Sequence, residues 1–95
     1  MTTSSDHEDG ATVELTPDEA IVLFDLLSRW SGKNETGETP SPACFESTAE
    51  GAVLNALLCL LEGQLVAPFK RDYNRLLMEA RQRLADGWSY PTLRG

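Results

Sequence analysis

The sequence predicts an all-α fold, most simply a small bundle of three helices with a disordered N-terminal tail and one long loop between the first two helices. Apolar residues recur at helical spacing in three separate stretches. Residue types that start and stop helices flank each stretch. Because 95 residues suffice for one domain only, we expect a tail over residues 1–12 and a single helical domain over residues 13–95.

The first stretch begins after a polar, acidic segment, residues 1–11, that has no periodicity and is expected to be disordered. Residues 13–15 alternate and could form a short extended piece. Thr16 and Glu19 then make a capping box around Pro17, which suits the first helical position. Gly32 is a natural stop. These signals predict a helix from Pro17 to about Ser31.

The connection over residues 33–45 should contain no α-helix, because Pro40 and Pro42 stand close together in it. A loop of this length is uncommon in a compact domain, and such loops are either functional or simply tolerated. Both interpretations stay open, so the loop is one candidate for partner contacts.

The second helix should run from Thr48 or Ala49 to Glu62 and end at Gly63. Ser47 and Glu50 have the spacing of a second capping box. Its apolar residues surround most of the helix circumference, which predicts a helix buried on more than one side. These residues are Val53, Leu54, Leu57, Leu58, Leu60 and Leu61.

The third helix should start near Arg71 or Asp72 and end at Asp86, with Gly87 as its C-cap. It follows a short apolar connection, residues 64–69, part of which could pair with residues 13–15. Its core stripe is Tyr73, Leu76, Leu77, Ala80 and Leu84. On its outer face we expect two ion pairs at helical spacing, Arg75 with Glu79 and Glu79 with Arg83.

The net charge of −7 argues against binding to nucleic-acid backbones, which are held by Lys and Arg. The charge is uneven along the chain. Residues 1–19 contain six acids and no Lys or Arg, whereas residues 70–95 contain six bases and three acids. Such asymmetry can mark a partner surface. The simpler interpretation is that the basic last helix pairs with acidic neighbours or is solvated.

The expected compartment is the cytoplasm, since the first fifteen residues lack the basic and apolar regions of a secretory signal. The longest apolar stretch, residues 52–61, is about half of what a membrane span needs. In a reducing cytosol Cys44 and Cys59 are expected to be free thiols.

The residues suited to catalysis or metal binding are too few and too scattered to predict an enzyme. His7, the only histidine, falls in the predicted tail. Cys59 is expected to be a small buried hydrophobe within its helix, and Cys44 has no base near it in sequence to lower its pKa. Two cysteines and one histidine do not make a zinc site. We therefore expect no catalytic residue, no cofactor and no metal.

More apolar residues are present than three small helices need for one shared core. A large exposed apolar patch usually marks an interface, so the sequence predicts a homodimer or a permanent protein partner. Alternatively, the C-terminal tail and residues 65–69 cover the surplus. The candidate interface residues are Val22, Leu54, Leu58, Trp88 and Tyr90.

Two stretches are similar to a known group of sequences. One is the LTPDEA start of the first helix, within Leu15–Phe24; the other is Leu61–Phe69, whose LVAPF connection leads to Tyr73. Together they resemble short, acidic, uncharacterised bacterial proteins. The resemblance covers residues 15–84 except the central loop. It implies a fold, and it implies no activity and no site residue.

These observations favour a non-enzymatic protein-binding module, such as an inhibitor of the immunity or antitoxin type, because a small acidic domain associates quickly with a basic target. The alternative is a homodimeric structural or regulatory subunit. A small enzyme would require an organised carboxylate cluster, or Cys44 exposed beside a base. Neither a nucleic acid nor a membrane is an expected partner.

Overall fold

A computed structural model describes residues 9–32, 39–66 and 70–93. They form the α-helices α2 (Pro17–Trp30), α3 (Thr48–Gln64) and α4 (Tyr73–Ala85), and the short 3-10 helix η1 (Pro42–Cys44). The all-α prediction is confirmed. Most of the predicted tail, with His7, lies outside the described residues, and residues 9–12 are exposed and not helical. Within the described ranges there is no strand, so residues 13–15 do not form the pairing with residues 65–66 that the sequence left open.

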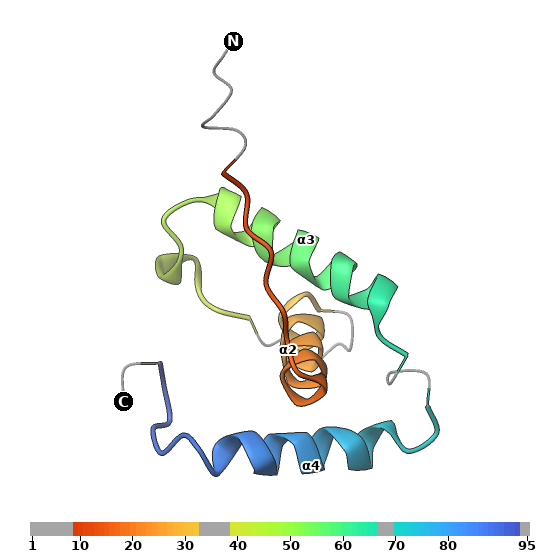
Figure 1. Ribbon diagram of the computed structural model, residues 1–95. Coiled ribbons are helices and arrows are strands. Elements are labelled where there is room, and N and C mark those ends of the chain that lie inside the picture. The colour runs from red at the N-terminus through yellow and green to blue at the C-terminus, as the bar shows by residue number, and fades with distance from the viewer. Residues whose placement is uncertain (1–8, 33–38, 67–69, 94–95) are drawn as a thin grey trace.

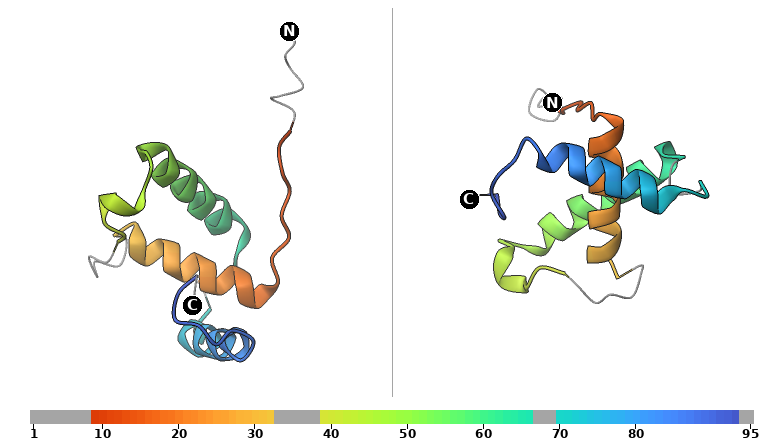
Figure 2. Two further views of the ribbon diagram at one scale, coloured as in Figure 1. Left: turned by 90° about the vertical axis from the view of Figure 1, so that its left-hand side faces the viewer. Right: turned by 90° about the horizontal axis from the view of Figure 1, so that it is seen from below.

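Helix α2 is the central helix, with α3 on one side and α4 on the other (Figure 1). Two further views show the same order, with α4 crossing α2 at a steep angle (Figure 2). The prediction that the second helix is buried on more than one side is wrong, because only Leu58 and Leu61 of α3 are buried. The helix that lies between two others is α2.

Two apolar cores meet on α2 because neighbouring residues of α2 point to different partners. Ala20 and Leu27 pack with Leu58 and Leu61 of α3. Ile21 packs with a second cluster on α4, consisting of Leu77 and Ala80. In a helix, consecutive side chains are about 100° apart, so Ala20 can pack against α3 while Ile21 packs against α4.

The boundaries of α2 follow the local signals in the sequence. The Thr16 hydroxyl accepts a hydrogen bond from the Glu19 N–H at 3.1 Å, and the Glu19 carboxylate accepts one from the Thr16 N–H at 2.9 Å. This is the predicted capping box. At the other end Ser31 is the C-cap and Gly32 has a φ of 81°. This left-handed conformation strongly favours glycine, so the predicted stop is confirmed.

Helix α3 begins at Thr48, as predicted, but differs from the prediction in its capping box and at its C-terminal end. The Ser47 hydroxyl accepts from the Ala49 N–H at 3.0 Å, while the Glu50 carboxylate accepts from Glu46 rather than from Ser47. The arrangement therefore caps the helix without being a reciprocal box. Gly63 does not end the helix, which continues to Gln64. A glycine inside a helix costs some stability but does not force a stop.

Helix α4 is slightly shorter than predicted. Asp72 occupies the N-cap position but makes no side-chain cap; its carboxylate bonds Arg75 instead. At the other end Asp86 is the C-cap, and Gly87 does not take the left-handed conformation that a glycine cap usually adopts.

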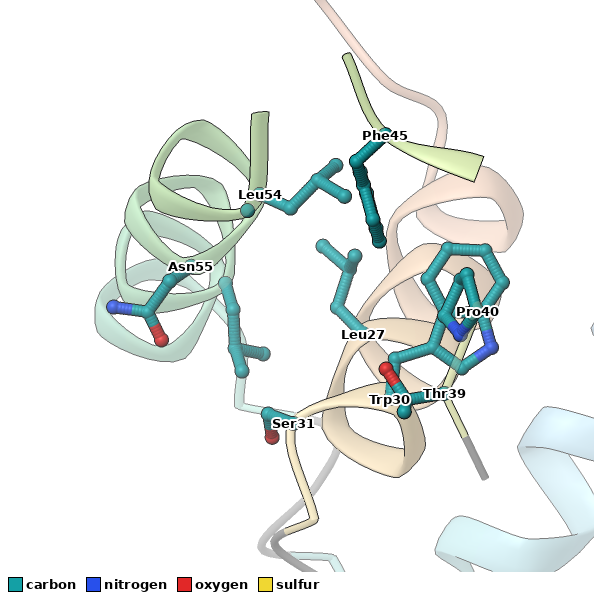
Figure 3. Close-up of a pocket in the computed structure, with 10 residues that line it drawn as sticks. Leu27, Trp30, Ser31, Thr39, Pro40, Phe45, Leu54 and Asn55 are labelled. Atoms are coloured by element: carbon teal, nitrogen blue, oxygen red, sulfur yellow. The ribbon is translucent and has the colours of Figure 1, made fainter. Parts of the chain in front are cut away.

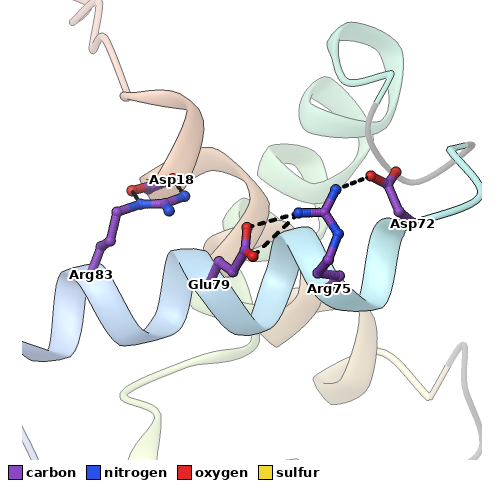
Figure 4. A network of polar contacts seen from close by, with 5 residues as sticks. All are labelled: Asp18, Asp72, Arg75, Glu79 and Arg83. Atoms are coloured by element: carbon purple, nitrogen blue, oxygen red, sulfur yellow. Dashed lines mark hydrogen bonds and ion pairs between the residues drawn. The ribbon is translucent and has the colours of Figure 1, made fainter.

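Charged side chains tie α4 to α2, as the simpler interpretation of the charge asymmetry predicted. Arg83 donates two hydrogen bonds to the Asp18 carboxylate, at 2.7 and 2.8 Å (Figure 4). Farther along, Arg81 donates to Asp25 at 2.6 Å. The predicted Arg75–Glu79 pair is present at 3.2 Å. The predicted pairing of Glu79 with Arg83 is wrong, because the Arg83 guanidinium is directed to Asp18.

Candidate protein-binding surface

The outer face of α3, which points away from α2, is exposed and carries no charge. Leu54, Leu58 and Leu61 face the core. On the opposite side Val53 is 66% exposed and Leu60 is 61% exposed. We call this opposite side the outer face of α3. It consists of Ala49, Ala52, Val53, Ala56, Cys59, Leu60 and Gly63, all of them exposed.

A groove of about 600 Å³ adjoins the C-terminal half of this face. Leu57 and Leu60 of α3 form one wall. Val13 and Leu15 of the extended segment before α2 form the other. Gln64 contributes a polar side chain to a lining that is otherwise almost entirely apolar. Leu60 therefore belongs both to the outer face and to the groove.

A second hollow, of about 420 Å³, adjoins the N-terminal half of the same face. It lies between η1 and α3 and is lined by Cys44, Phe45 and Val53, among others. Phe45 also borders a smaller cavity of about 220 Å³ between α2 and α3, where it points toward Leu27 and Leu54 (Figure 3). The described end of the long loop, residues 39–45, thus extends the apolar surface of α3.

The described segments that form this surface carry acidic residues and no basic ones. The described segments that form it, residues 9–16 and 39–66, contain five acids and no Lys or Arg. The acids are Asp9, Glu14, Glu46, Glu50 and Glu62. Residues 70–93 contain five bases and three acids. The α3 side of the molecule is therefore negative, while bases lie on the α4 side.

The five predicted interface residues do not form one surface. Leu58 is wrong as an interface residue, since it is 1% exposed in the core between α2 and α3. Leu54 and Val22 are half-buried and pack against the two cores. Trp88 and Tyr90 are exposed, and their rings pack edge to face with centroids 5.3 Å apart.

The alternative that the C-terminal tail covers the surplus apolar surface is also wrong for the residues that the structure describes. Trp88, Tyr90 and Leu93 are all exposed. In the other proposed cover, residues 65–69, Leu65 packs against a core and Val66 is exposed, while residues 67–69 lie outside the described part of the chain. The outer face of α3 therefore stays uncovered within the described part of the chain.

Sequence reasoning missed Val53 and Leu60 as the exposed pair. They are seven residues apart and so share one side of a helix. The signal was present in their spacing, but Leu54 and Leu61 have the same spacing. Only the position of α2 decides which of the two pairs is buried.

The cysteines and titratable groups give no support to a catalytic site. Cys59 is exposed on the outer face of α3, so its predicted burial is wrong; Cys44 is exposed too, and both are free thiols. Over residues 9–32, 39–66 and 70–93, no three His, Cys, Asp or Glu side chains gather as metal ligands would. None of the described helices has the length and apolar character needed to cross a membrane.

Among the residues that the structure describes, the groups with displaced pKa values lie on α2 and α4 and not on α3. Hydrogen bonding from Arg83 lowers the pKa of Asp18. Partial burial raises the pKa of Tyr73, and the neighbouring Asp25 carboxylate adds to this shift. These groups belong to the junction of two helices, so their shifts reflect structural pairing.

Comparison of the chain with family models, with curated proteins and with solved structures found no match.

Proposed function

We propose that this chain is a non-enzymatic protein-binding module that receives a basic protein partner on the outer face of α3. The observation that carries the proposal is the uncharged outer face itself, with Val53 and Leu60 exposed at its two halves. Exposed apolar side chains that adjoin one another favour association, because burying them removes apolar area from water.

The sign of the charge around this face favours a basic partner. Five acids and no base lie in the segments that form the surface. Opposite charges at the rim of an interface raise the rate of association and select among partners. An inhibitor of the immunity or antitoxin type, which binds a basic target protein tightly, would use a surface of this kind.

The test compares two substitutions of similarly exposed apolar residues on different helices. Leu60→Gln removes a large apolar side chain from the outer face of α3, whereas Met78→Gln does the same on α4, where Met78 is 66% exposed. Wild type and Met78→Gln, each immobilised, should retain the same protein from an extract, and Leu60→Gln should not.

Retention should also fall as the salt concentration rises, since salt screens the charges at the rim. Circular dichroism of both variants should match the wild type, because each substituted side chain is mostly exposed. Equal retention by Leu60→Gln and Met78→Gln would contradict the proposed surface.

The second candidate is a homodimer that uses the same face. The observation that favours it is the alternation of large and small residues along α3, since two such faces can interlock. The charged residues in the described segments that form that face, residues 9–16 and 39–66, are all acids, so two copies would repel one another at low salt. Sedimentation therefore separates the two candidates: a homodimer should persist or strengthen as salt rises, whereas a complex with a basic partner should weaken.

A further inference from the structure

We propose that the partner segment received by α3 is an amphipathic helix with an apolar seam and basic flanks, which packs along the outer face of α3. The inference rests on the proposed function and adds the shape and chemistry of the segment that binds. In this arrangement the partner helix adds a layer next to α3, in the order α4, α2, α3 and partner.

The spacing of residues on the outer face suits a helix. Five exposed residues follow one another at intervals of four, three, four and three: Ala49, Val53, Ala56, Leu60 and Gly63. This is the spacing of the seam between two helices in a coiled coil. From Ala49 to Gly63 the seam is about 21 Å long at 1.5 Å per residue. A facing helix can contact all of it, whereas a loop would contact only part.

Large and small side chains alternate along the seam, which leaves room for a partner's side chains. A Cβ placed on Gly63 would meet no atom within 4 Å, so the space over this residue is open. Ala49 and Ala56 have short side chains, so large residues of a facing helix can settle between Val53 and Leu60.

Each of the two large seam residues borders a hollow that can take an anchoring side chain. Val53 lines the hollow of about 420 Å³ beside Phe45. Leu60 lines the groove of about 600 Å³ beside Val13. Binding energy in protein interfaces concentrates in large side chains that fill such hollows. We therefore expect the partner helix to carry one large apolar residue near each end of its seam.

Charge decides between a partner helix and a second copy of this chain. Glu46 and Glu50 lie at the N-terminal end of α3, and Glu14 lies beside Leu15 near the C-terminal groove. No base accompanies them in the described residues 9–16 and 39–66. Lysine or arginine on the flanks of the incoming helix would neutralise these acids, whereas a second α3 would bring only more acids.

The test uses two synthetic peptides of about three heptads with the same leucine seam. One carries lysine on its flanks and the other carries glutamate. Binding to the full-length chain is measured by calorimetry. The lysine peptide should bind at least about tenfold more tightly than the glutamate peptide, and its affinity should fall about tenfold or more between about 50 mM and about 500 mM NaCl.

The location of binding is tested with the same matched variants and with a thiol. Leu60→Gln should weaken binding of the lysine peptide about tenfold, and Met78→Gln should leave it unchanged. In a Cys44→Ser background the bound lysine peptide should slow alkylation of Cys59, which is exposed beside the seam. Equal binding of both peptides, or binding unaffected by Leu60→Gln, would overturn the inference.

The two proposals can fail separately. If an extract protein is retained in a Leu60-dependent way while neither peptide binds, α3 is a docking surface and the assignment of a basic helix is wrong. If retention of the extract protein does not depend on Leu60, the docking surface itself is wrong.

Discussion

At the scale of single residues, two exposed arginines on α4 differ in the carboxylate that each one pairs with. Arg83 and Arg75 are almost equally exposed, at 58% and 59%. Arg83 reaches across to Asp18 on α2, while Arg75 stays within its own segment, on Asp72 and Glu79. Of these two arginines, only Arg83 therefore links α4 to α2.

Replacing Arg83 should change the titration of Asp18. The Arg83 hydrogen bond lowers the pKa of Asp18 below its ordinary value of 3.8. Because the folded-state pKa is lowered, the pair stabilises the fold above the unfolded pKa, and this contribution is lost as pH falls through the folded pKa. In Arg83→Gln the pKa of Asp18, followed by NMR, should rise toward 3.8, and this part of the acid-dependent loss of stability should disappear.

Arg75→Gln is the control for this measurement, since it removes a similarly exposed arginine from α4 without touching Asp18. The pKa of Asp18 should be the same in Arg75→Gln as in the wild type. An unchanged pKa in Arg83→Gln would mean that the bidentate pair does not persist in solution.

At the scale of elements, the two glycines that follow apolar stretches have different roles. Gly32 has a φ of 81° just beyond the C-cap of α2. Gly63 lies inside α3, where no atom would contact an added Cβ. The backbone conformation requires a glycine at position 32, whereas at position 63 it does not, and glycine there weakens the helix.

Alanine should therefore have opposite effects at the two positions. Gly63→Ala should raise the free energy of unfolding by roughly 0.5–1 kcal/mol, because alanine favours the helix and restricts the unfolded chain. Gly32→Ala should lower it by about 1 kcal/mol or more, because its left-handed conformation is strained for any residue with a Cβ. Urea denaturation measures both. A destabilised Gly63→Ala would indicate that α3 ends before this residue.

Local signals in the sequence were enough to predict where α2 begins and ends, because Thr16, Glu19 and Gly32 act on neighbouring backbone groups. The face that α3 buries could not be predicted in the same way. Leu58 and Leu60 are two residues apart on a helix that is apolar nearly all round, and both would satisfy a core. The choice of Leu58 depends on the position of α2, which is tertiary information.

Tertiary information also decides the partner of Arg83 on α4, which the sequence predicted to be Glu79. Glu79 and Arg83 have ideal helical spacing, and an exposed pair of this kind contributes only a few tenths of a kcal/mol. Asp18 offers Arg83 two charge-assisted hydrogen bonds across the helix junction. Sequence spacing alone does not reveal the longer-range partner, which lies 65 positions away.

At the scale of the whole molecule, α2 joins two cores that are built from different residues. One core contains Ala20 and Leu58, and the other contains Ile21 and Leu77. The main contacts of α3 and of α4 are both with α2. This layered order leaves the outer face of α3 without a cover in the described chain, and it implies that the outer layers can open separately.

Hydrogen exchange should therefore show the amides of α2 to be the most protected, because both layers cover this helix. Ile21→Val removes one methylene from the core on the α4 side and should cost about 0.5–1.5 kcal/mol. If α4 can open while α3 stays packed, exchange in α4 should accelerate more than exchange in α3. A single core shared by all three helices would instead lower the protection of α3 and α4 by the same factor.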